Sequence, residues 1–227
     1  MDNFTSVNPI IVAKALCKNI NLKGSQLNIL HQISLEIKLS ESIAIMGPSG
    51  AGKTTLLGLL AGLDTPSSGS VLLGGVNIFA LDEEGRTRVR GKNVSFVFQS
   101  FYLLDNLTAL ENVMLPLQLH GDPEAKNKAI SLLQTVGLGD RMQHLPRQLS
   151  GGEQQRVAIA RAFVTKPAIL FADEPTGNLD QKTGDMVASL LFDMNKKFAT
   201  TLVIVTHESS LAARCDRIIN LNKGGLD

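Results

Sequence analysis

The chain has 227 residues, with 22 basic and 21 acidic side chains and a formal net charge of +1. This balance gives no reason to expect a nucleic-acid surface or a polyanionic partner. No apolar run reaches the roughly 20 residues that a membrane-spanning helix needs, and the polar start at Asp2 and Asn3 does not resemble a signal peptide. Cys17 and Cys215 lack metal-ligand spacing and are expected to be reduced thiols. We therefore expect a cytoplasmic chain with one domain.

Apolar periodicity and turn residues predict strands that alternate with helices along most of the chain. The expected strands cover residues 10–16, 27–37, 43–46, 70–73, 76–78, 94–98, 168–172, 201–205 and 217–221, with a polar loop at 19–26. The expected helices cover residues 55–61, 81–90, 123–136, 184–197 and 208–213. This alternation indicates an α/β fold with a largely parallel sheet covered by helices. The mainly helical stretch 103–164 predicts an inserted helical subdomain.

Two capping boxes mark the starts of further helices in that stretch. Thr108 and Glu111 have the Ser/Thr-x-x-Glu spacing, and Ser150 and Glu153 repeat it. Pro116 is expected to end or kink the first of these helices.

Residues 47–54 match the phosphate-binding pattern Gly-x4-Gly-Lys-Ser/Thr between an apolar strand and an apolar helix. The loop is Gly47, Pro48, Ser49, Gly50, Ala51, Gly52, Lys53 and Thr54. Its glycines let backbone N–H groups surround a phosphate, and the helix that follows adds partial positive charge. Lys53 is expected to reach the β- and γ-phosphates, and the Thr54 hydroxyl to ligate Mg²⁺. The alternative is a glycine-rich turn that binds nothing.

The buried strand 168–172 leads directly into two carboxylates, Asp173 and Glu174. In a phosphate-loop nucleotidase, Asp173 would hold Mg²⁺, through water, and Glu174 would orient or deprotonate the attacking water. An isolated Asp-Glu pair at a strand end is equally typical of a solvated turn. The continuation into 175–180 favours the functional interpretation.

The second capping box adds a second anion site to the sequence. Gly151 and Gly152 leave the first turn of their helix without side chains, so that its N–H groups are open to an anion. A triphosphate already held by residues 47–54 needs no second cradle from the same chain. We therefore expect this site to serve the nucleotide bound by a partner molecule.

Taken together, these segments resemble the nucleotide-binding subunits of ABC transporters. The resemblance rests on 47–54 (Walker A), Gln99 (Q-loop), 149–154 (signature), 169–174 (Walker B), 177–180 (D-loop) and His207 (switch histidine), in the family's order and spacing. It implies a P-loop NTPase core with a mostly parallel sheet, an antiparallel β subdomain and an inserted α-helical subdomain. It also implies one nucleotide-binding domain over 1–227, with the core at about 1–98 and 166–227 and the helical part at about 99–165.

The resemblance further implies an ATPase that uses ATP and Mg²⁺ and works as a head-to-tail homodimer. The residues expected to contact ATP are Gly47 to Thr54, Thr55, Gln99, Ser150, Gly151, Gly152, Glu153 and Asp180. Thr54, Gln99 and Asp173 would contact the metal, and Glu174 and His207 would be catalytic. A lone histidine after a strand is more often a loop residue, but its setting in Val205-Thr206-His207-Glu208 favours the switch role.

Finer features resemble the MacB, LolD and FtsE group of this family. They lie in 96–101 and 104–113, and segments 109–113, 136–139 and 211–217 are similar to one branch of the group. The analogy implies a separate membrane permease that exports, extracts lipid or hydrophobic compounds, or transmits force across the envelope, with this chain on the inner face of the cytoplasmic membrane. The apolar loop 101–107 is expected either to contact that permease or simply to pack the subdomain.

Two other functions remain open. One is an FtsE-like scaffold that uses ATP-dependent dimerisation as a switch, because its catalytic residues would look the same. The other is an ABC protein of DNA repair or translation, although these carry a second nucleotide domain, a long coiled coil or a basic surface.

One position departs from the wider family. Ile20, within 18–21, stands where an aromatic ring usually stacks on adenine. Loss of such a platform typically forfeits about 1 kcal/mol. We therefore expect modest nucleotide affinity and relaxed base selectivity.

Overall fold

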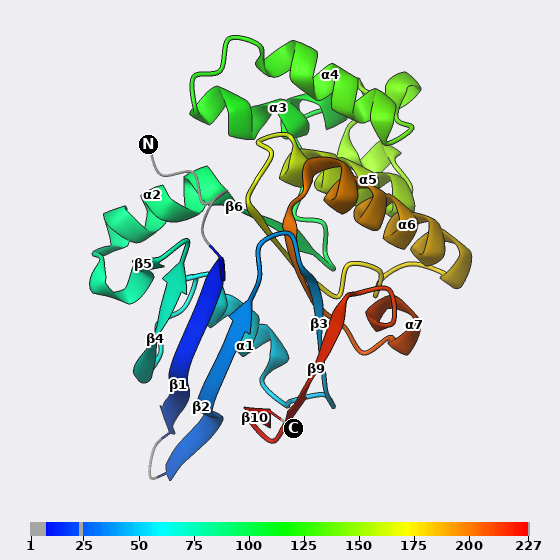
Figure 1. Cartoon of the computed structure of the whole chain (residues 1–227). Helices are drawn as coiled ribbons and strands as arrows, with labels where there is room; N and C mark the ends of the chain where they lie inside the picture. The colour runs from blue at the N-terminus through cyan, green and yellow to red at the C-terminus, as the bar shows by residue number, and fades with distance from the viewer. Residues whose placement is uncertain (1–7, 23–24, 227) are drawn as a thin grey trace. The chain divides into compact units, whose positions relative to one another are not determined.

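The computed structural model describes residues 8–22 and 25–226 (Figure 1), so Asp2 and Asn3, and Lys23 and Gly24 of the expected polar loop, lie outside the described part. Contacts between Cα atoms divide the chain into two compact units. The first lies within Met1–Val94, Ala168–Asp173 and Thr200–Asp227, and the second within Ser95–Pro167 and Glu174–Ala199. No helix of the described residues is long and apolar enough to cross a membrane.

A parallel sheet forms the centre of the first unit. Those of its strands that lie in the first unit are, in spatial order, β10 (Gly225–Leu226), β9 (Arg217–Asn222), β3 (Ser42–Met46), β8 (Thr201–Val205) and β7 (Ile169–Asp173). All neighbours are parallel except β10, which pairs antiparallel with β9. The side chains of β8 are all buried, as are those of β7 before Asp173. Such continuous apolar runs are typical of parallel strands that are covered on both faces.

A second, antiparallel sheet in this unit contains the chain's first two long strands. Its order is β2 (Ser25–Ile37), β1 (Ile11–Leu22), β4 (Ser68–Leu73) and β5 (Val76–Asn77). The expectation of a polar loop at 19–26 was wrong. Strand β1 continues through Leu22 and pairs Asn19 with Asn28 and Ile20 with Leu27. Hairpin pairing supplies backbone hydrogen bonds that override the low strand propensity of asparagine and lysine.

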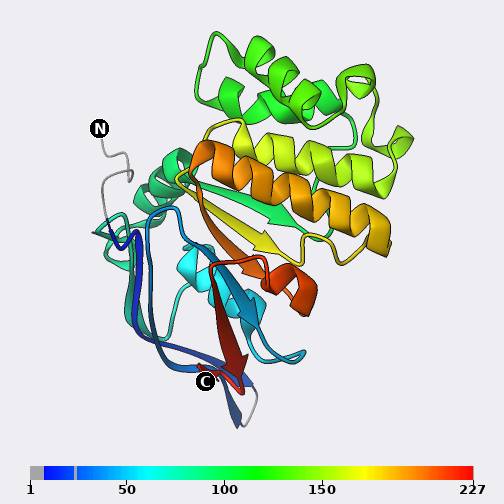
Figure 2. The same ribbon diagram turned by 45° about the vertical axis from the view of Figure 1, so that its right-hand side comes forward.

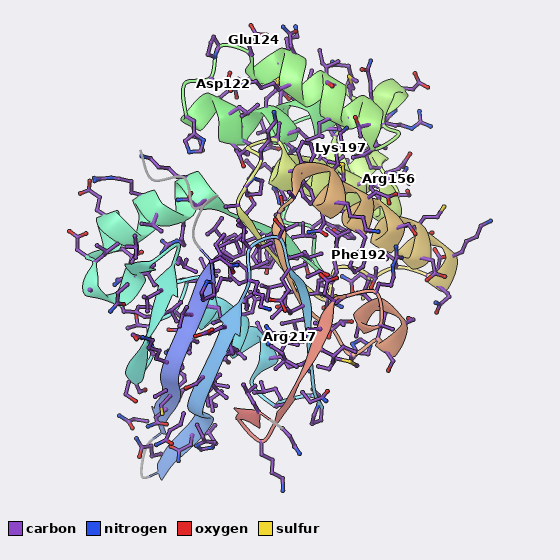
Figure 3. All side chains as sticks on the ribbon, viewed as in Figure 1. Asp122, Glu124, Arg156, Phe192, Lys197 and Arg217 are labelled. Carbon is purple, nitrogen blue, oxygen red and sulfur yellow. The ribbon has the colours of Figure 1, made fainter. Side chains whose placement is uncertain are left out.

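The two sheets of the first unit are joined by an arginine at the start of β9. Arg217, labelled in Figure 3, donates from Nε to Glu41 Oε1 at 2.8 Å and from Nη2 to the Glu36 carbonyl at 2.6 Å. These bonds connect β9 to the end of β2 and to the turn before β3. The helices of this unit are α1 (Lys53–Leu60), α2 (Glu83–Asn93), α7 (Ser209–Ala212) and a 3₁₀ turn at Ile78–Ala80.

The second unit is mainly helical. It contains α3 (Ala109–Leu119), α4 (Ala125–Thr135), α5 (Gly151–Phe163), α6 (Gln181–Phe198), most of β6 (Val94–Phe98) and two 3₁₀ turns at Gly139–Arg141 and Pro146–Gln148. Helices α5 and α6 lie side by side, as Figures 1 and 2 both show. Contacts place α6 in this unit, although the sequence suggested the core for 166–227. The single-domain division itself stays a prediction.

Both expected capping boxes are present in this unit, at Thr108 with Glu111 and at Ser150 with Glu153. Pro116 does not end α3, which continues past it to Leu119. Together, the mostly parallel sheet, the antiparallel sheet and the helical unit confirm the fold class expected from the sequence.

A buried asparagine fixes the loop that precedes α3. Asn112 is 1% exposed, and its amide donates to the carbonyls of Leu104, Leu107 and Thr108 while accepting from the Leu104 N–H. A loop with so many carbonyls turned inward needs such a donor, because unpaired buried carbonyls are costly.

We expect Asn112→Ala to lower the free energy of unfolding by about 2 kcal/mol, since these backbone groups lose their partner. Urea denaturation measures this change. Gln118→Ala, at an exposed position of the same helix, is the matched control and should change stability by less than about 0.5 kcal/mol. Equal effects of the two substitutions would contradict the role of Asn112.

Candidate nucleotide-binding site

The loop at 47–52 joins β3 to α1 in the first unit and is closely held by β9. A Cβ atom at Gly47 would lie only 2.1 Å from the Leu221 carbonyl oxygen, so no other residue fits there. Lys53 folds back onto the loop and donates from Nζ to the carbonyls of Gly47, at 2.9 Å, and Pro48, at 3.1 Å. The ammonium group is therefore held at the mouth of the loop, where a phosphate can replace these carbonyls as its partner.

Helix α1, like α4, differs from the other long helices at its N-terminus. Side chains of Asp82, Thr108, Ser150 and Asp180 cap α2, α3, α5 and α6. In the part of the chain that the structure covers, α1 starts at Gly52 with no side-chain cap. Its first N–H groups need acceptors, and the helix dipole favours an anion there.

Three parallel strands of the first unit bring the phosphate loop, Asp173 and His207 to one edge. Ile45 of β3, Val205 of β8 and Asp173 of β7 lie in one register row. The phosphate loop begins two residues after Ile45, and His207 follows two residues after Val205. Because ligands in open α/β sheets bind at the carboxyl ends of the strands, this row is where a nucleotide phosphate belongs.

Direct hydrogen bonds connect the segments at this edge. The Thr54 hydroxyl donates to Asp173 Oδ1 at 3.3 Å, which pairs two of the three expected metal ligands. The Thr206 N–H donates to the Ile45 carbonyl at 3.2 Å, and the Thr206 hydroxyl accepts from the Glu208 N–H at 3.0 Å. These two bonds fix the backbone on both sides of His207, whose side chain is exposed.

Glu174 is the first residue after Asp173 and has an unusual backbone. Its φ of +46° lies in the left-handed region, where a residue with a Cβ is strained by about 1 kcal/mol. The Gly177 N–H donates to the Glu174 carbonyl and closes a turn. Strain of this kind is common where a side chain is held in a functional position.

In the second unit, Gln99 is bound to a residue that sequence reasoning did not single out. Gln99 donates from Nε2 to Asn178 Oδ1 at 2.9 Å, and Asn178 donates from Nδ2 to the Gln99 carbonyl at 3.0 Å. A Cβ at Gly177 would lie 2.8 Å from Gln99 Nε2. The Q-loop and D-loop segments are therefore directly coupled.

Gln155 is a second residue that the sequence analysis missed. It is fully buried, and its Nε2 donates to the carbonyls of Pro175 and Phe98, which adjoin Glu174 and Gln99. Within the described residues its Oε1 has no hydrogen-bond partner, which costs free energy. An apolar side chain would avoid this cost if the position served packing alone. A polar residue on the buried face of α5 was the available sequence signal.

The N-terminus of α5 is arranged differently from that of α1. Its capping box uses the N–H groups of Ser150 and Glu153, not those of the two glycines between them. The Ser150 N–H lowers the pKa of Glu153, and an ion pair with Arg141 acts in the same direction. Gly152 is buried, and a Cβ there would lie 2.3 Å from Thr183 Cγ2, so packing against α6 requires this glycine.

Asp180, which the sequence predicts to contact ATP, also caps the N-terminus of α6. Its carboxylate accepts from the Thr183 N–H at the start of α6, and hydrogen bonds from Thr183 lower the pKa of Asp180. The group is therefore ionised at neutral pH and is stabilised by the positive end of the helix.

Ile20 lies on a strand rather than in a loop. It pairs across β1 and β2 with Leu27, and the two side chains are 44% and 49% exposed. The two side chains form a small aliphatic surface at the position where the wider family has an aromatic ring. Relaxed base selectivity stays a prediction.

The structure thus gathers the phosphate loop, Asp173 and His207 in the first unit, and gathers Gln99, Glu174, Ser150 and Asp180 in the second. A phosphate loop with an uncapped helix, paired with a hydroxyl and a carboxylate at the ends of parallel strands, defines a nucleoside triphosphatase. A model of the ABC transporter family matches residues 30–177, and the chain belongs to this family. It is therefore an ATP-binding and ATP-hydrolysing cassette.

Individual relatives agree with the group expected from the sequence. The chain is 53% identical to the uncharacterised ABC transporter ATP-binding protein YbbA of Escherichia coli K12, over 96% of both chains. It is 48% identical to the lipoprotein-releasing system ATP-binding protein LolD of Legionella pneumophila strain Lens, again over 96% of both. The expected LolD-type group is confirmed, and segments 109–113, 136–139 and 211–217 had already suggested similarity to YbbA.

Solved structures give the same result for the fold. The ATP-binding cassette MJ0796, in a dimeric post-hydrolysis state bound to ADP and Pi, matches with a TM-score of 0.88 and 39% identity over 96% of each chain. A second dimeric structure of MJ0796, described as a bacterial ABC transporter cassette, has the same TM-score and 40% identity. The expectation of an ABC ATPase fold is confirmed.

We expect Gln155→Met to lower kcat for ATP hydrolysis at least about tenfold while changing the free energy of unfolding by less than about 1 kcal/mol. Methionine removes the unpaired Oε1, which favours stability, and it also removes the donor to Pro175 and Phe98, which lowers stability, so the two effects on stability oppose each other. Activity falls because the backbone beside Glu174 and Gln99 loses the hydrogen bonds that position it. Steady-state kinetics and urea denaturation separate these effects. Gln134→Met, exposed on α4, is the control, and unchanged turnover in Gln155→Met would rule out a positioning role.

Proposed function

We propose that the chain works as a homodimeric ATPase that drives a separate membrane permease of the MacB/LolD-partner type from the inner face of the cytoplasmic membrane. The observation that carries this proposal is the Thr54–Asp173 hydrogen bond at the strand ends where the phosphate loop begins. LolD is by its name part of a lipoprotein-releasing system, and MJ0796 is dimeric, which supports the partner and the oligomeric state. These relatives support the transporter ATPase over the scaffold alternative.

We assign the triphosphate to the loop Gly47–Thr54 with Thr55. Lys53 exchanges its bonds with the Gly47 and Pro48 carbonyls for bonds to the β- and γ-phosphates, and the uncapped N–H groups of α1 donate hydrogen bonds to the phosphate oxygens. Positioning and charge neutralisation account for most of phosphoryl transfer, so this cradle supplies the first part of catalysis.

Glu174 and His207 act on the attacking water. Glu174, held in its left-handed backbone conformation, accepts the proton of the water or orients it. His207, fixed through Thr206 to β3, binds the γ-phosphate and the same water. Ser150, Gly151 and Gly152 of a second copy complete the γ-phosphate contacts, Glu153 belongs to the same ATP-binding segment, and Asp180 connects the two sites.

The residues also fit a magnesium ion. Thr54 Oγ1 and Asp173 Oδ1 are 3.3 Å apart and are hard oxygen donors, which Mg²⁺ prefers together with phosphate oxygens and water. Gln99 is the third expected ligand, and it must release Asn178 before its side chain can turn toward a metal. When bound, the ion would neutralise charge on the β- and γ-phosphates.

The loop 101–107 offers a contact for the permease. Tyr102 and Leu104 are 64% and 48% exposed, while Leu110 and Val113 are buried and therefore belong to the core of the unit. Arg161 donates to the carbonyls of Phe101 and Tyr102 and holds this loop in place. A fixed loop with exposed apolar side chains suits docking of a cytoplasmic helix.

We expect Glu174→Gln to bind ATP and dimerise, yet to hydrolyse ATP at least about 100-fold more slowly, because the water loses its base. Nucleotide binding, size-exclusion chromatography and phosphate release measure the three properties. Asp185→Asn, exposed on α6, should leave all three unchanged. Hydrolysis at the normal rate by Glu174→Gln would remove Glu174 from this role.

We expect Tyr102→Ala combined with Leu104→Ala to abolish co-purification of the permease from detergent-solubilised membranes and to remove any change in ATP turnover that the permease causes. Leu119→Ala, which removes a side chain that is 78% exposed at the end of α3, is the matched control. If turnover is the same with and without the co-purified membrane protein, the scaffold alternative is favoured.

A further inference from the structure

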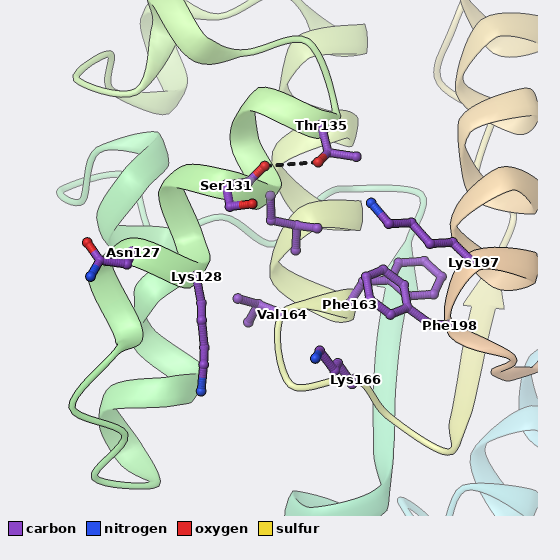
Figure 4. A pocket seen from close by; sticks show the side chains of 10 residues that line it. Asn127, Lys128, Ser131, Thr135, Phe163, Val164, Lys166, Lys197 and Phe198 are labelled. Atoms are coloured by element: carbon purple, nitrogen blue, oxygen red, sulfur yellow. Dashed lines mark hydrogen bonds between the residues drawn. The ribbon is translucent and has the colours of Figure 1, made fainter.

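A pocket of about 400 Å³ opens in the second unit, on the side of α5 and α6 where these helices end (Figure 4). It is formed by α4 and by the C-terminal residues of α5 and α6, and none of the expected nucleotide contacts lines it. The lining residues are Asn127, Lys128, Ser131, Leu132, Thr135, Phe163, Val164, Lys166, Lys197 and Phe198.

The floor of the pocket is apolar. Leu132, Phe163 and Val164 are at most 7% exposed, and the rings of Phe163 and Phe198 stack with centroids 5.7 Å apart. A cavity of this size lies within the range of about 300–1,000 Å³ that small-molecule sites occupy. The floor therefore suits an aromatic ring or an acyl chain of moderate length.

The rim of the pocket is positively charged. Lys128 comes from α4, Lys166 follows α5 and Lys197 lies near the end of α6, so three different segments each contribute one ammonium group (Figure 4). Among these lining residues, all of which the structure describes, there is no carboxylate. The hydroxyls of Ser131 and Thr135 stand on the same rim, and Thr135 donates to the Ser131 carbonyl at 2.9 Å.

Nearby negative charge offsets only part of this rim. The C-terminal ends of α5 and α6 together carry about one negative charge, and Lys128 pairs with Asp122 just outside the pocket. The rim thus keeps an excess of about one positive charge. Stabilisation of helix ends explains Lys166 and Lys197, but not Lys128, which lies in the first turn of α4, where a cation opposes the helix dipole.

We propose that this pocket binds a small amphipathic monoanion, a molecule with one carboxylate or similar acid group on an apolar body. The body lies on Leu132, Phe163 and Phe198, and the acid group is bound by Lys166 and Lys197 with Lys128 at the edge. The site is separate from the nucleotide contacts and requires no part of the proposed permease coupling.

Decanoate is the test ligand, added to the purified full-length protein and followed by isothermal titration calorimetry. We expect saturable binding with one site per chain, and at least about tenfold weaker binding of decanol and of decylammonium, since they lack the negative charge. Equal binding of decanoate and decanol would overturn the proposal, as would no binding of decanoate at millimolar concentration.

Variants locate the binding. Lys166→Gln combined with Lys197→Gln should weaken decanoate binding at least about tenfold, and Thr135→Trp, at an exposed rim position, should abolish it by filling the pocket. Lys126→Gln combined with Lys196→Gln removes two exposed lysines of α4 and α6 that do not line the pocket, and it should leave the affinity unchanged. Thermal unfolding reports whether each variant is folded, and equal weakening by both lysine pairs would show non-specific attraction and refute the site.

Discussion

The structure depends on one register row in the parallel sheet. Because Ile45, Val205 and Asp173 are paired across β3, β8 and β7, the segments that follow these strands emerge at one edge. The buried strands behind this row cannot shift without exposing an apolar core, so the row is fixed. The phosphate loop, Thr54 and the backbone around His207 are then connected by local hydrogen bonds that need no further scaffold.

The helix N-termini of this ATPase are of two kinds, with and without a side-chain cap. The N-terminus of α1 lacks a side-chain cap in the described structure and leaves its N–H groups open to the phosphate that we propose binds there, whereas Ser150 and Asp180 cap α5 and α6. An incoming phosphate at α5 must therefore use the N–H groups of the two glycines. The far ends of the same two helices line the lysine-rimmed pocket.

Sequence reasoning was most accurate where the pattern itself expresses the chemistry. The phosphate loop, the two capping boxes and the apolar strands were predictable because each depends on residues close together in the chain. It failed where strand pairing decides the structure, as in the strand through Asn19 and Ile20. Asn178 and the lysine-rimmed pocket could not be found, because their partners are distant in sequence. Gln155 had only one sequence signal, its place as a polar residue on the buried face of α5, and its partners are also distant.

The sequence by itself determined the family, the ATP chemistry and the identity of the expected site residues, since glycines, a lysine and carboxylates at set spacings have few other uses. Only the tertiary structure decided which of these groups touch within each unit and which glycines serve packing. Gly152 is the clearest case, because its pattern suggested an open anion site while Thr183 occupies the space that a side chain would need. Residues 47–54 similarly match a phosphate-binding pattern by themselves. Strand register, however, decides that Asp173 meets Thr54 there, because register depends on the burial of whole strands.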